Sequence, residues 1–337
     1  MDAADRELLQ TTIHDALAAH AEANPTAATE AMLGVPARAD DVLADLGWFE
    51  MLEAEPRDAV SIVAQELGAT DAYASILDDV FAAALGVEPR ADLAVVLPPY
   101  PGTASPAPGS GSSAAGIGTA RASSAAELLV VRASSGTTAT EAVLVPASAA
   151  TVTPVAGIAP RWGATKVAIA TIAGTDVALA PGAWDTAIAA GRRAVGHEIV
   201  GANRTMIALA REHALDRIQF GKPIAQFQAL RHKLAEAFVA VESTDAALTS
   251  AWDVADSAEG LMTAALAKAL AARGARTVAT HTQQVLAGIG FTTDHQFHFF
   301  LKRCLLLEGM LGSADSITLE VGRHLLATRN VPTLIEL

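Results

Sequence analysis

The sequence predicts an α+β fold in which two helical regions flank a small β domain. Apolar residues recur with helical spacing up to about residue 93, and short β-branched segments separated by Gly and Pro occupy residues 126–180. Helical patterns return and lengthen from residue 183 to the end. We therefore expect an N-terminal helical domain over residues 1–97, a middle β domain over 98–182 and a C-terminal four-helix bundle over 183–337.

The composition excludes several classes of protein. Hydrophobic residues make up 51% of the 337 residues but aromatic ones only 4%, so alanine-rich helix packing is expected. The net charge of −14 would repel a phosphate backbone, which argues against nucleic acid as a partner. The N-terminus is acidic and polar, and no apolar run approaches the roughly 18–20 residues of a membrane span. With Cys304 as the single cysteine, we expect a cytoplasmic protein without disulfides or membrane contact.

The N-terminal domain is predicted to be short and helical. Its apolar spacing indicates helices over residues 5–20, 40–46, 57–67 and 72–85. Gly68 and Gly86 stand where glycines that end helices are expected.

The middle domain is predicted to begin with a loop. Residues 98–125 are nearly all Pro, Gly, Ser and Ala, a composition that favours a loop or linker. Two Gly-x-Gly pairs in this stretch invite a phosphate-loop interpretation, but no clear strand precedes them, so a surface loop is favoured. The strands of a small antiparallel sheet or barrel are expected over residues 127–133, 141–146, 151–155, 166–172 and 175–179.

The C-terminal domain is predicted to be an up-down bundle, with helices over residues 185–219, 224–254, 258–287, 296–307 and 314–328. Within it, residues 210–228 read AREHALDRIQFGKPIAQFQ, a helix that ends in a turn. Arg217 lies in the last turn, and Gly221 and Pro223 stop the helix. A guanidinium is a rigid fork suited to a pyrophosphate, and Phe220 and Phe227 can line an aromatic cofactor.

This segment closely resembles a family signature. Arg217-Ile218-Gln219-Phe220-Gly221-Lys222-Pro223-Ile224, followed by Phe227-Gln228, is similar to the R-x-x-F-G-K/R-P-I/L…F-Q motif of acyl-CoA dehydrogenases. In that family the arginine and phenylalanine contact the ADP half of FAD. The resemblance therefore implies cofactor contacts from Arg217, Gln219, Phe220, Phe227 and Gln228.

A second segment resembles the same family. Residues 281–292, HTQQVLAGIGFT, are similar to its Q-x-x-G-G-x-G-F segment, in which small residues let a backbone approach the ligand. The resemblance implies FAD contacts from Gln284, Ala287 and Gly288. In the family, both motifs clasp the FAD of a neighbouring subunit, so an oligomer is implied.

The carboxylate base of the family is missing from the sequence. Acyl-CoA dehydrogenases take a proton from the carbon next to the thioester with a carboxylate, usually a glutamate, while hydride leaves for the flavin. At the two places where the family carries this base, the sequence has Leu311 and Gly191, although Arg192 matches the arginine that follows the second place. The segment that lines the flavin ring in the family also has no counterpart.

These departures imply a subunit that binds FAD without catalysing the reaction. The chain resembles the shorter, non-catalytic subunit of actinobacterial α2β2 acyl-CoA dehydrogenases that act on sterol side chains. The acyl-CoA would then lie mainly at a catalytic partner subunit, and the isolated chain would be inactive. Two alternatives stay open: a self-sufficient enzyme with Glu308 as a relocated base, and a non-enzymatic interaction protein on the same scaffold.

Other side chains favour structural roles. Glu198 is about two helical turns from Gly191, too far to replace it. His281, His295 and His298, with Asp294, lack the spacing of a full ligand set, so no metal site is predicted. Cys304, Trp162 and Trp184 are expected to pack in the core.

Overall fold

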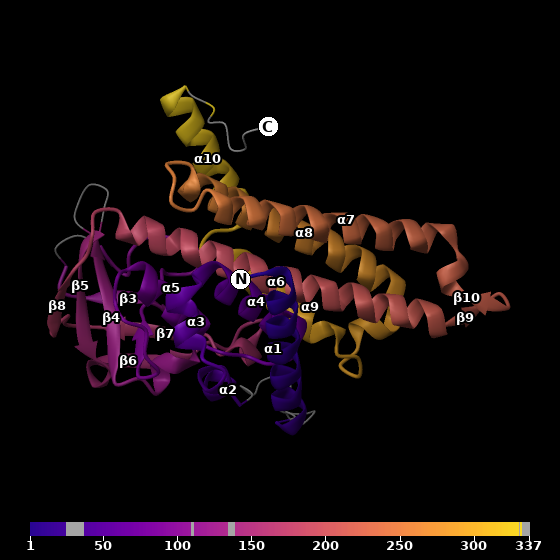
Figure 1. The fold of residues 1–337 in the computed structure, drawn as a ribbon, viewed down its shortest axis with the longest axis horizontal. Coiled ribbons are helices and arrows are strands. Elements are labelled where there is room, and N and C mark those ends of the chain that lie inside the picture. Colours follow the sequence, from indigo (N-terminus) through magenta and orange to yellow (C-terminus); the bar gives the residue numbers. More distant parts are fainter. Residues whose placement is uncertain (25–36, 109–110, 134–138, 330, 332–337) are drawn as a thin grey trace.

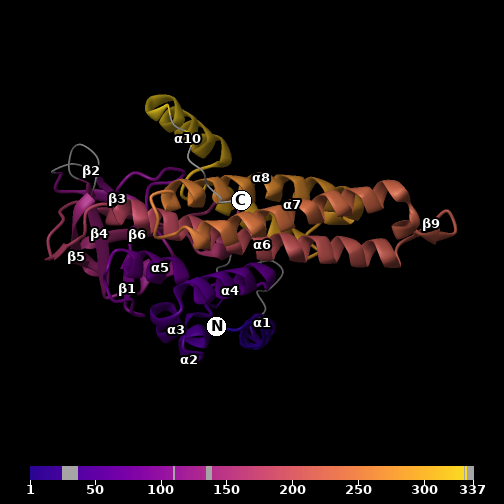
Figure 2. The same ribbon diagram turned by 45° about the horizontal axis from the view of Figure 1, so that its top comes forward.

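The computed structural model describes residues 1–24, 37–108, 111–133, 139–329 and 331. Figures 1 and 2 show a β layer at one end of an elongated molecule, with a long helical bundle leading away from it and the N-terminal helices along one side. The N-terminal helices are α1 (Ala3–Ala23), α2 (Asp40–Asp45), α3 (Trp48–Ala54), α4 (Pro56–Ala69) and α5 (Ile76–Ala84).

The β layer consists of two sheets. The larger contains β1 (Leu93–Val95), β2 (Ala107–Pro108), β4 (Glu127–Ala133), β5 (Ala139–Pro146) and β8 (Thr175–Ala178). Its order is β1-β4-β5-β8, with β2 also pairing with β4, and both β1 and β2 run parallel to β4. The smaller sheet is antiparallel, in the order β3 (Ala114–Gly118), β7 (Thr165–Ile169) and β6 (Ala150–Pro154). Buried residues from both sheets share one apolar cluster, including Val130, Val143 and Val167.

The bundle is built around α6 (Ala183–Asp216), which packs against α7 (Gln228–Asp253), α8 (Gly260–Leu286) and α9 (Phe297–Gly309). The last helix, α10 (Ala314–Thr328), projects from the bundle in Figure 1. A short hairpin of β9 (Ile218–Gln219) and β10 (Lys222–Pro223) joins α6 to α7. Five 3-10 turns complete the described elements: η1 (Ala120–Ser123), η2 (Ala147–Ala149), η3 (Pro160–Trp162), η4 (Ile224–Gln226) and η5 (Ala287–Phe291).

The N-terminal helices attach to the bundle through a close crossing of α4 and α6. A Cβ atom on Gly68 would lie 2.0 Å from the carbonyl oxygen of Glu198, and one on Gly201 would lie 1.9 Å from that of Gln65. Only glycine allows two helix backbones to come this near. Gly68 therefore lies inside α4, and its prediction as a helix-ending residue was wrong, whereas Gly86 follows α5 with φ of 74°.

The structure confirms the order of helices, small β domain and helical bundle, and corrects several elements. The 98–125 segment is not a single loop, because it contains β2, β3 and η1. The parallel pairing of β1 and β2 with β4 departs from the antiparallel sheet or barrel that was expected. Helix α3 and strand β1 were not predicted, and α5 begins at Ile76 rather than at residue 72.

The three side chains expected to pack in the core do so. Trp162, Trp184 and Cys304 are all buried in the apolar core that joins the helical domains.

Candidate functional site

The chain turns sharply at the end of α6. The helix was expected to continue to residue 219 but ends at Asp216, and Arg217 caps it with an extended backbone. Gln219 pairs with Lys222 across the hairpin, and the two residues between them, Phe220 and Gly221, have φ of 53° and 77°. Two successive positive φ angles suit a two-residue hairpin turn, which glycine adopts freely and phenylalanine does not.

Phe220 is exposed at the tip of this hairpin. Its side chain is 92% exposed. Its ring meets Phe227 edge to face, with 6.1 Å between ring centroids, and the Nζ of Lys222 lies 4.6 Å from the Phe227 centroid. An exposed phenylalanine in a left-handed conformation is unfavourable for an isolated chain, which indicates that the tip is shaped for a contact.

The polar side chains of the same motif make few contacts with the rest of the chain. The guanidinium of Arg217 is exposed and has no hydrogen bond or ion pair to the described residues. Gln219 donates from Nε2 to the carbonyl of Ile218 (2.7 Å), and the Nε2 atoms of Gln228 and His232 lie 3.3 Å apart. These side chains are therefore available to a ligand without breaking an ion pair.

The second motif forms the end of α8 and the η5 turn. Gln284 is exposed in the last turn of α8. Ala287 follows with φ of 52° and ψ of −133°, a conformation that costs a non-glycine residue about 1–3 kcal/mol. A Cβ on Gly288 would meet nothing within 4 Å. A strained alanine beside an open glycine presents backbone that a ligand can approach.

The two motifs lie at the same end of the bundle. Helices α6 and α8 both end there, and α7 begins there, away from the β layer in Figures 1 and 2. Burial lowers the pKa of His213, and the charges of His295 and Arg217 lower it further, so the segment after η5 lies close to the end of α6. The structure thus places the predicted site residues of both motifs at the same end of the bundle, whereas their contact with a cofactor stays a prediction.

The two positions at which the family carries its base also meet in space. A Cβ on Gly191 of α6 would lie 2.7 Å from Cδ1 of Leu311 and 2.4 Å from Cε2 of Phe81. Leu311 is 4% exposed and Phe81 is fully buried. The place where a base would stand is filled by two apolar side chains.

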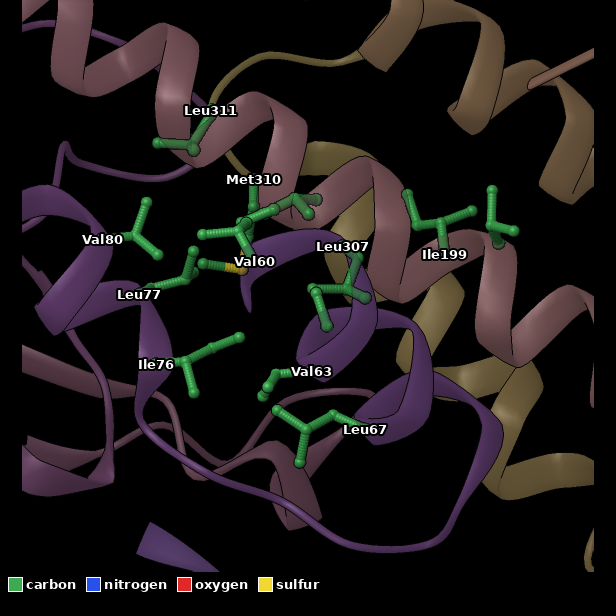
Figure 3. Close-up of a cluster of buried hydrophobic side chains, with 14 of the residues drawn as sticks. Val60, Val63, Leu67, Ile76, Leu77, Val80, Ile199, Leu307, Met310 and Leu311 are labelled. Atoms are coloured by element: carbon green, nitrogen blue, oxygen red, sulfur yellow. The ribbon is translucent and has the colours of Figure 1, made fainter. Parts of the chain in front are cut away.

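This filled region belongs to a larger apolar core. Figure 3 shows Leu311 and Met310 next to Val60, Leu77 and Val80, with these residues coming from α4, α5 and the segment that follows α9.

Buried cations hold the loop that carries Leu311. Arg192 donates from Nε to the carbonyl of Leu311 (3.0 Å) and pairs with Glu320 (3.3 Å). Lys268 donates from Nζ to the carbonyls of Glu308 (2.8 Å) and Gly312 (3.1 Å). Burial lowers the pKa of Lys268 to about 7. The sequence placed Arg192 in a family motif but gave no indication of Lys268, whose partners are all main-chain oxygens.

The two carboxylates that the sequence offered as alternative bases are already engaged. Glu308 accepts a hydrogen bond from Arg276 (2.7 Å). Glu198 is buried, accepts from the indole of Trp162 (3.3 Å) and lies 3.6 Å from Nε of Arg303. Burial raises the pKa of Glu198. One carboxylate oxygen of Glu308 is therefore engaged with Arg276.

The segment between β1 and β2 packs on the bundle. Tyr100 donates weakly to the carbonyl of Leu306 (3.5 Å), and its hydroxyl would lie 2.0 Å from a Cβ on Gly309. Trp184 donates to the carbonyl of Thr103 (3.1 Å). The segment after β1 is thus held against α6 and α9 at the edge of the filled region.

The histidines make separate contacts. His281 pairs with Glu236 (3.0 Å), Nδ1 of His295 accepts from the amide of Phe297 (3.1 Å), and the ring of His298 lies 4.0 Å from that of Phe299 at a tilt of 57°. In the described part of the chain, no group of three or more His, Cys, Asp or Glu side chains could hold a metal ion.

Comparison with known proteins identifies the bundle. Residues 183–326 match the family described as acyl-CoA dehydrogenase, C-terminal domain. The C-terminal domain of this chain belongs to the acyl-CoA dehydrogenase family. Members of this family generally bind FAD, and their reaction is a flavin-dependent oxidation of a CH–CH bond. Among curated relatives, the acyl-CoA dehydrogenase FadE34 of Mycobacterium tuberculosis is 35% identical over 120 residues, which cover 35% of this chain and 17% of FadE34.

Solved structures extend the likeness to the whole chain. A variant of the Tcur3481–Tcur3483 steroid ACAD has a TM-score of 0.79 at 21% identity, covering 96% of this chain and 98% of that one. The ChsE4–ChsE5 complex from Mycobacterium tuberculosis has a TM-score of 0.77 at 21% identity, covering 99% of each chain. The full chain therefore has the acyl-CoA dehydrogenase fold. No helix among the described residues is long and apolar enough to cross a membrane.

Proposed function

We propose that this chain is the FAD-binding, non-catalytic subunit of a hetero-oligomeric acyl-CoA dehydrogenase, and that it supplies ADP-side contacts to the FAD of a catalytic partner. The observation that carries the proposal is the contact between Gly191, Leu311 and Phe81. Both positions that hold the base in the family are apolar and closed, while both nucleotide-binding motifs are retained and exposed, with Ala287 in place of one glycine of the second.

Absence of a base removes one half of the reaction from this chain. Dehydrogenation needs a carboxylate within hydrogen-bonding reach of the proton it takes. A leucine and a glycine cannot accept that proton. Proton abstraction is therefore assigned to the partner subunit.

The exposed motifs have the chemistry that the ADP half of a flavin needs. The free guanidinium of Arg217 matches a pyrophosphate, because it can donate two parallel hydrogen bonds to phosphate oxygens. Phe220 offers an aromatic face, and Gln284 offers an amide beside the open backbone of Gly288. FAD, when bound, supplies the hydride acceptor, and the residues of this chain hold its nucleotide end.

The same end of the bundle presents apolar side chains that a partner would cover. Ile218 is 60% exposed, Ile289 41% and Phe291 75%, in addition to Phe220. Exposed apolar residues gathered around a nucleotide motif favour a subunit boundary. The two structural neighbours named above, ChsE4–ChsE5 and Tcur3481–Tcur3483, each carry two protein names, and this supports a paired assembly. By the same analogy, a steroid side-chain CoA thioester is the proposed substrate of the complex.

Co-purification with a catalytic acyl-CoA dehydrogenase subunit tests the proposal. We expect one FAD for each pair of unlike chains, and no stable flavin on this chain alone. Arg217→Ala should weaken FAD binding in the complex by about 1.5–3 kcal/mol, measured as FAD retention at rising salt. Arg323→Ala, which removes an exposed arginine on α10, should leave retention unchanged.

The alternatives give different results. A self-sufficient enzyme would bleach its flavin with an acyl-CoA in the absence of a partner, and Glu308→Gln would abolish that bleaching. An interaction protein without an enzymatic role would show no flavin in any assembly. Dehydrogenase activity from the isolated chain would contradict the proposal.

A further inference from the structure

A groove of about 840 Å³ lies on the opposite side of α6 from Gly191. Its walls come from α3, α4, α5, the first half of α6 and the connection between α7 and α8. Leu52, Val60, Val80, Ala84 and Trp252 line its apolar part. Arg193, two residues beyond Gly191, also lines it, and side chains two residues apart on a helix point about 200° apart. The groove therefore lies on another face of α6 from Gly191, although Val60 and Val80 belong both to its wall and to the apolar region around Leu311.

Arg193 is buried without a polar partner. Its side chain is 6% exposed, and its Nε is fully buried with no hydrogen-bond acceptor. The guanidinium carbon lies 4.5 Å from the ring centroid of Trp252, whose own Nε1 donates to His197 (3.0 Å). Among the described residues, Arg193 makes no hydrogen bond or ion pair.

The other buried arginines each make at least one hydrogen bond or ion pair, although Nε of Arg161 and Nε of Arg303 also lack a hydrogen-bond partner. Arg121 and Arg161 pair with aspartates, and Arg192 and Arg303 donate to main-chain carbonyls. A guanidinium has five N–H donors, and an aromatic face accepts none of them in the plane where they point. The charge of Asp256 favours the Arg193 cation without a hydrogen bond, so the N–H groups of the guanidinium stay free to donate to an acceptor in the groove.

The charges around the groove define that acceptor. Glu50, Glu53, Glu88 and Asp256 line its edge, and Arg57 is already paired with Asp253 at 2.7 Å. A ligand with several negative charges would be repelled by four carboxylates. A single negative charge that reaches Arg193 is compatible with them, and the apolar walls suit a hydrocarbon body.

We propose that this groove binds a monocarboxylic acid with an elongated apolar body, with its carboxylate on the guanidinium of Arg193 and its hydrocarbon against Val60, Val80 and Trp252. Burial lowers the pKa of Arg193 to about 10, so the side chain is still a cation at neutral pH. The site does not depend on FAD or on a partner subunit, so it stands apart from the proposed function.

Titration of the full-length chain with dodecanoate, followed by calorimetry and by tryptophan fluorescence, tests this site. The matched neutral probe is 1-dodecanol. We expect saturable binding of dodecanoate, and Arg193→Met should weaken it at least tenfold while changing dodecanol binding less than twofold. The control Arg57→Met removes an arginine that is already paired at the edge, and should change dodecanoate binding less than threefold.

A second variant keeps the test valid if Arg193→Met folds poorly. Ala83 is an exposed residue of α5 in the groove wall, and Ala83→Trp should block the groove and weaken both probes at least tenfold. Absence of dodecanoate binding to the natural chain would overturn the proposal. Equal dodecanoate affinity in Arg193→Met, or unchanged binding in Ala83→Trp, would overturn it as well.

Discussion

Replacing Gly191 with alanine measures how tightly the family's base position is closed. The new Cβ would stand 2.4 Å from Cε2 of Phe81 and 2.7 Å from Cδ1 of Leu311, whereas carbon atoms normally pack at about 3.5–4.0 Å. Relieving both contacts requires shifts of about 1 Å in two buried side chains. Such overpacking costs about 1–3 kcal/mol.

A compensating term acts in the opposite direction. Alanine is favoured over glycine inside a helix by about 1 kcal/mol, so Gly191→Ala should destabilise the fold by about 0–2 kcal/mol. In a Leu311→Ala background, which itself costs about 2–5 kcal/mol, one of the two clashes disappears. The second substitution should then be more favourable than in the natural chain by about 1 kcal/mol.

Urea unfolding followed by both circular dichroism and tryptophan fluorescence gives these energies if the two transitions coincide. Gly322→Ala is the matched control, because Gly322 lies in α10 with nothing within 4 Å of a new Cβ, and it should stabilise by up to about 1 kcal/mol. If Gly191→Ala stabilised the chain as much as Gly322→Ala, the position would be open and the case for a closed site would fail.

Three further substitutions test other features of the structure. Lys268 has a pKa of about 7 in the folded chain, against 10.5 for the free side chain. Between these values the unfolded chain binds one more proton than the folded chain, so the free energy of unfolding should rise with pH across that window. Lys268→Met should lack this rise in unfolding measured as a function of pH, and a profile identical to that of the natural chain would contradict the assignment. Gly201→Ala places a Cβ 1.9 Å from the carbonyl oxygen of Gln65, a backbone atom that cannot rotate away. We therefore expect thermal unfolding to show a loss of about 3 kcal/mol or more in the free energy of unfolding. A smaller loss than that of Gly191→Ala would argue against the α4–α6 crossing. Ala287→Gly should raise the melting temperature, with a net gain of about 0.5–2 kcal/mol in the free energy of unfolding. Relief of the backbone strain at this positive φ outweighs the greater conformational freedom that glycine gives the unfolded chain. A lower melting temperature would show that this backbone is unstrained.

Functional motifs whose residues are adjacent in the sequence could be predicted from the sequence. The residues of the 217–228 motif follow one another along the chain, so their order alone indicated a turn with a cation and two aromatic rings. The end of the helix was misplaced by three residues, because Phe220 adopts a positive φ that its residue type disfavours.

Close backbone approach was harder to predict than motif chemistry. Strand β3, with the sequence AAGIG, was assigned to a loop because glycine-rich segments usually form loops. A Cβ on Gly116 would stand 2.2 Å from the carbonyl oxygen of Leu97, so this glycine is required by tight packing instead. Gly68 was misread for the same reason, since a sequence does not show which neighbour will come near.

Juxtapositions of distant residues could not be predicted at all. Gly191 and Leu311 were identified separately as base positions, but their mutual contact depends on how the loop after α9 returns to α6. The groove around Arg193 depends likewise on α3, α5 and the α7–α8 connection meeting beside α6. Adjacent arginines in an alanine-rich helix were the available hint, and only Arg192 matched a known motif.

Helix α6 runs without a break through 34 residues, a length of about 51 Å. Its first half is enclosed by other elements and its last turns reach the β9–β10 hairpin, so one rigid rod connects the β layer to the distal tip. The N-terminal helices pack on the same helix, because α4 crosses it closely at Gly201. Limited proteolysis should accordingly release no stable fragment that contains only half of the chain. A subunit that binds at the β9–β10 hairpin would have its position relative to the β layer fixed by one continuous helix.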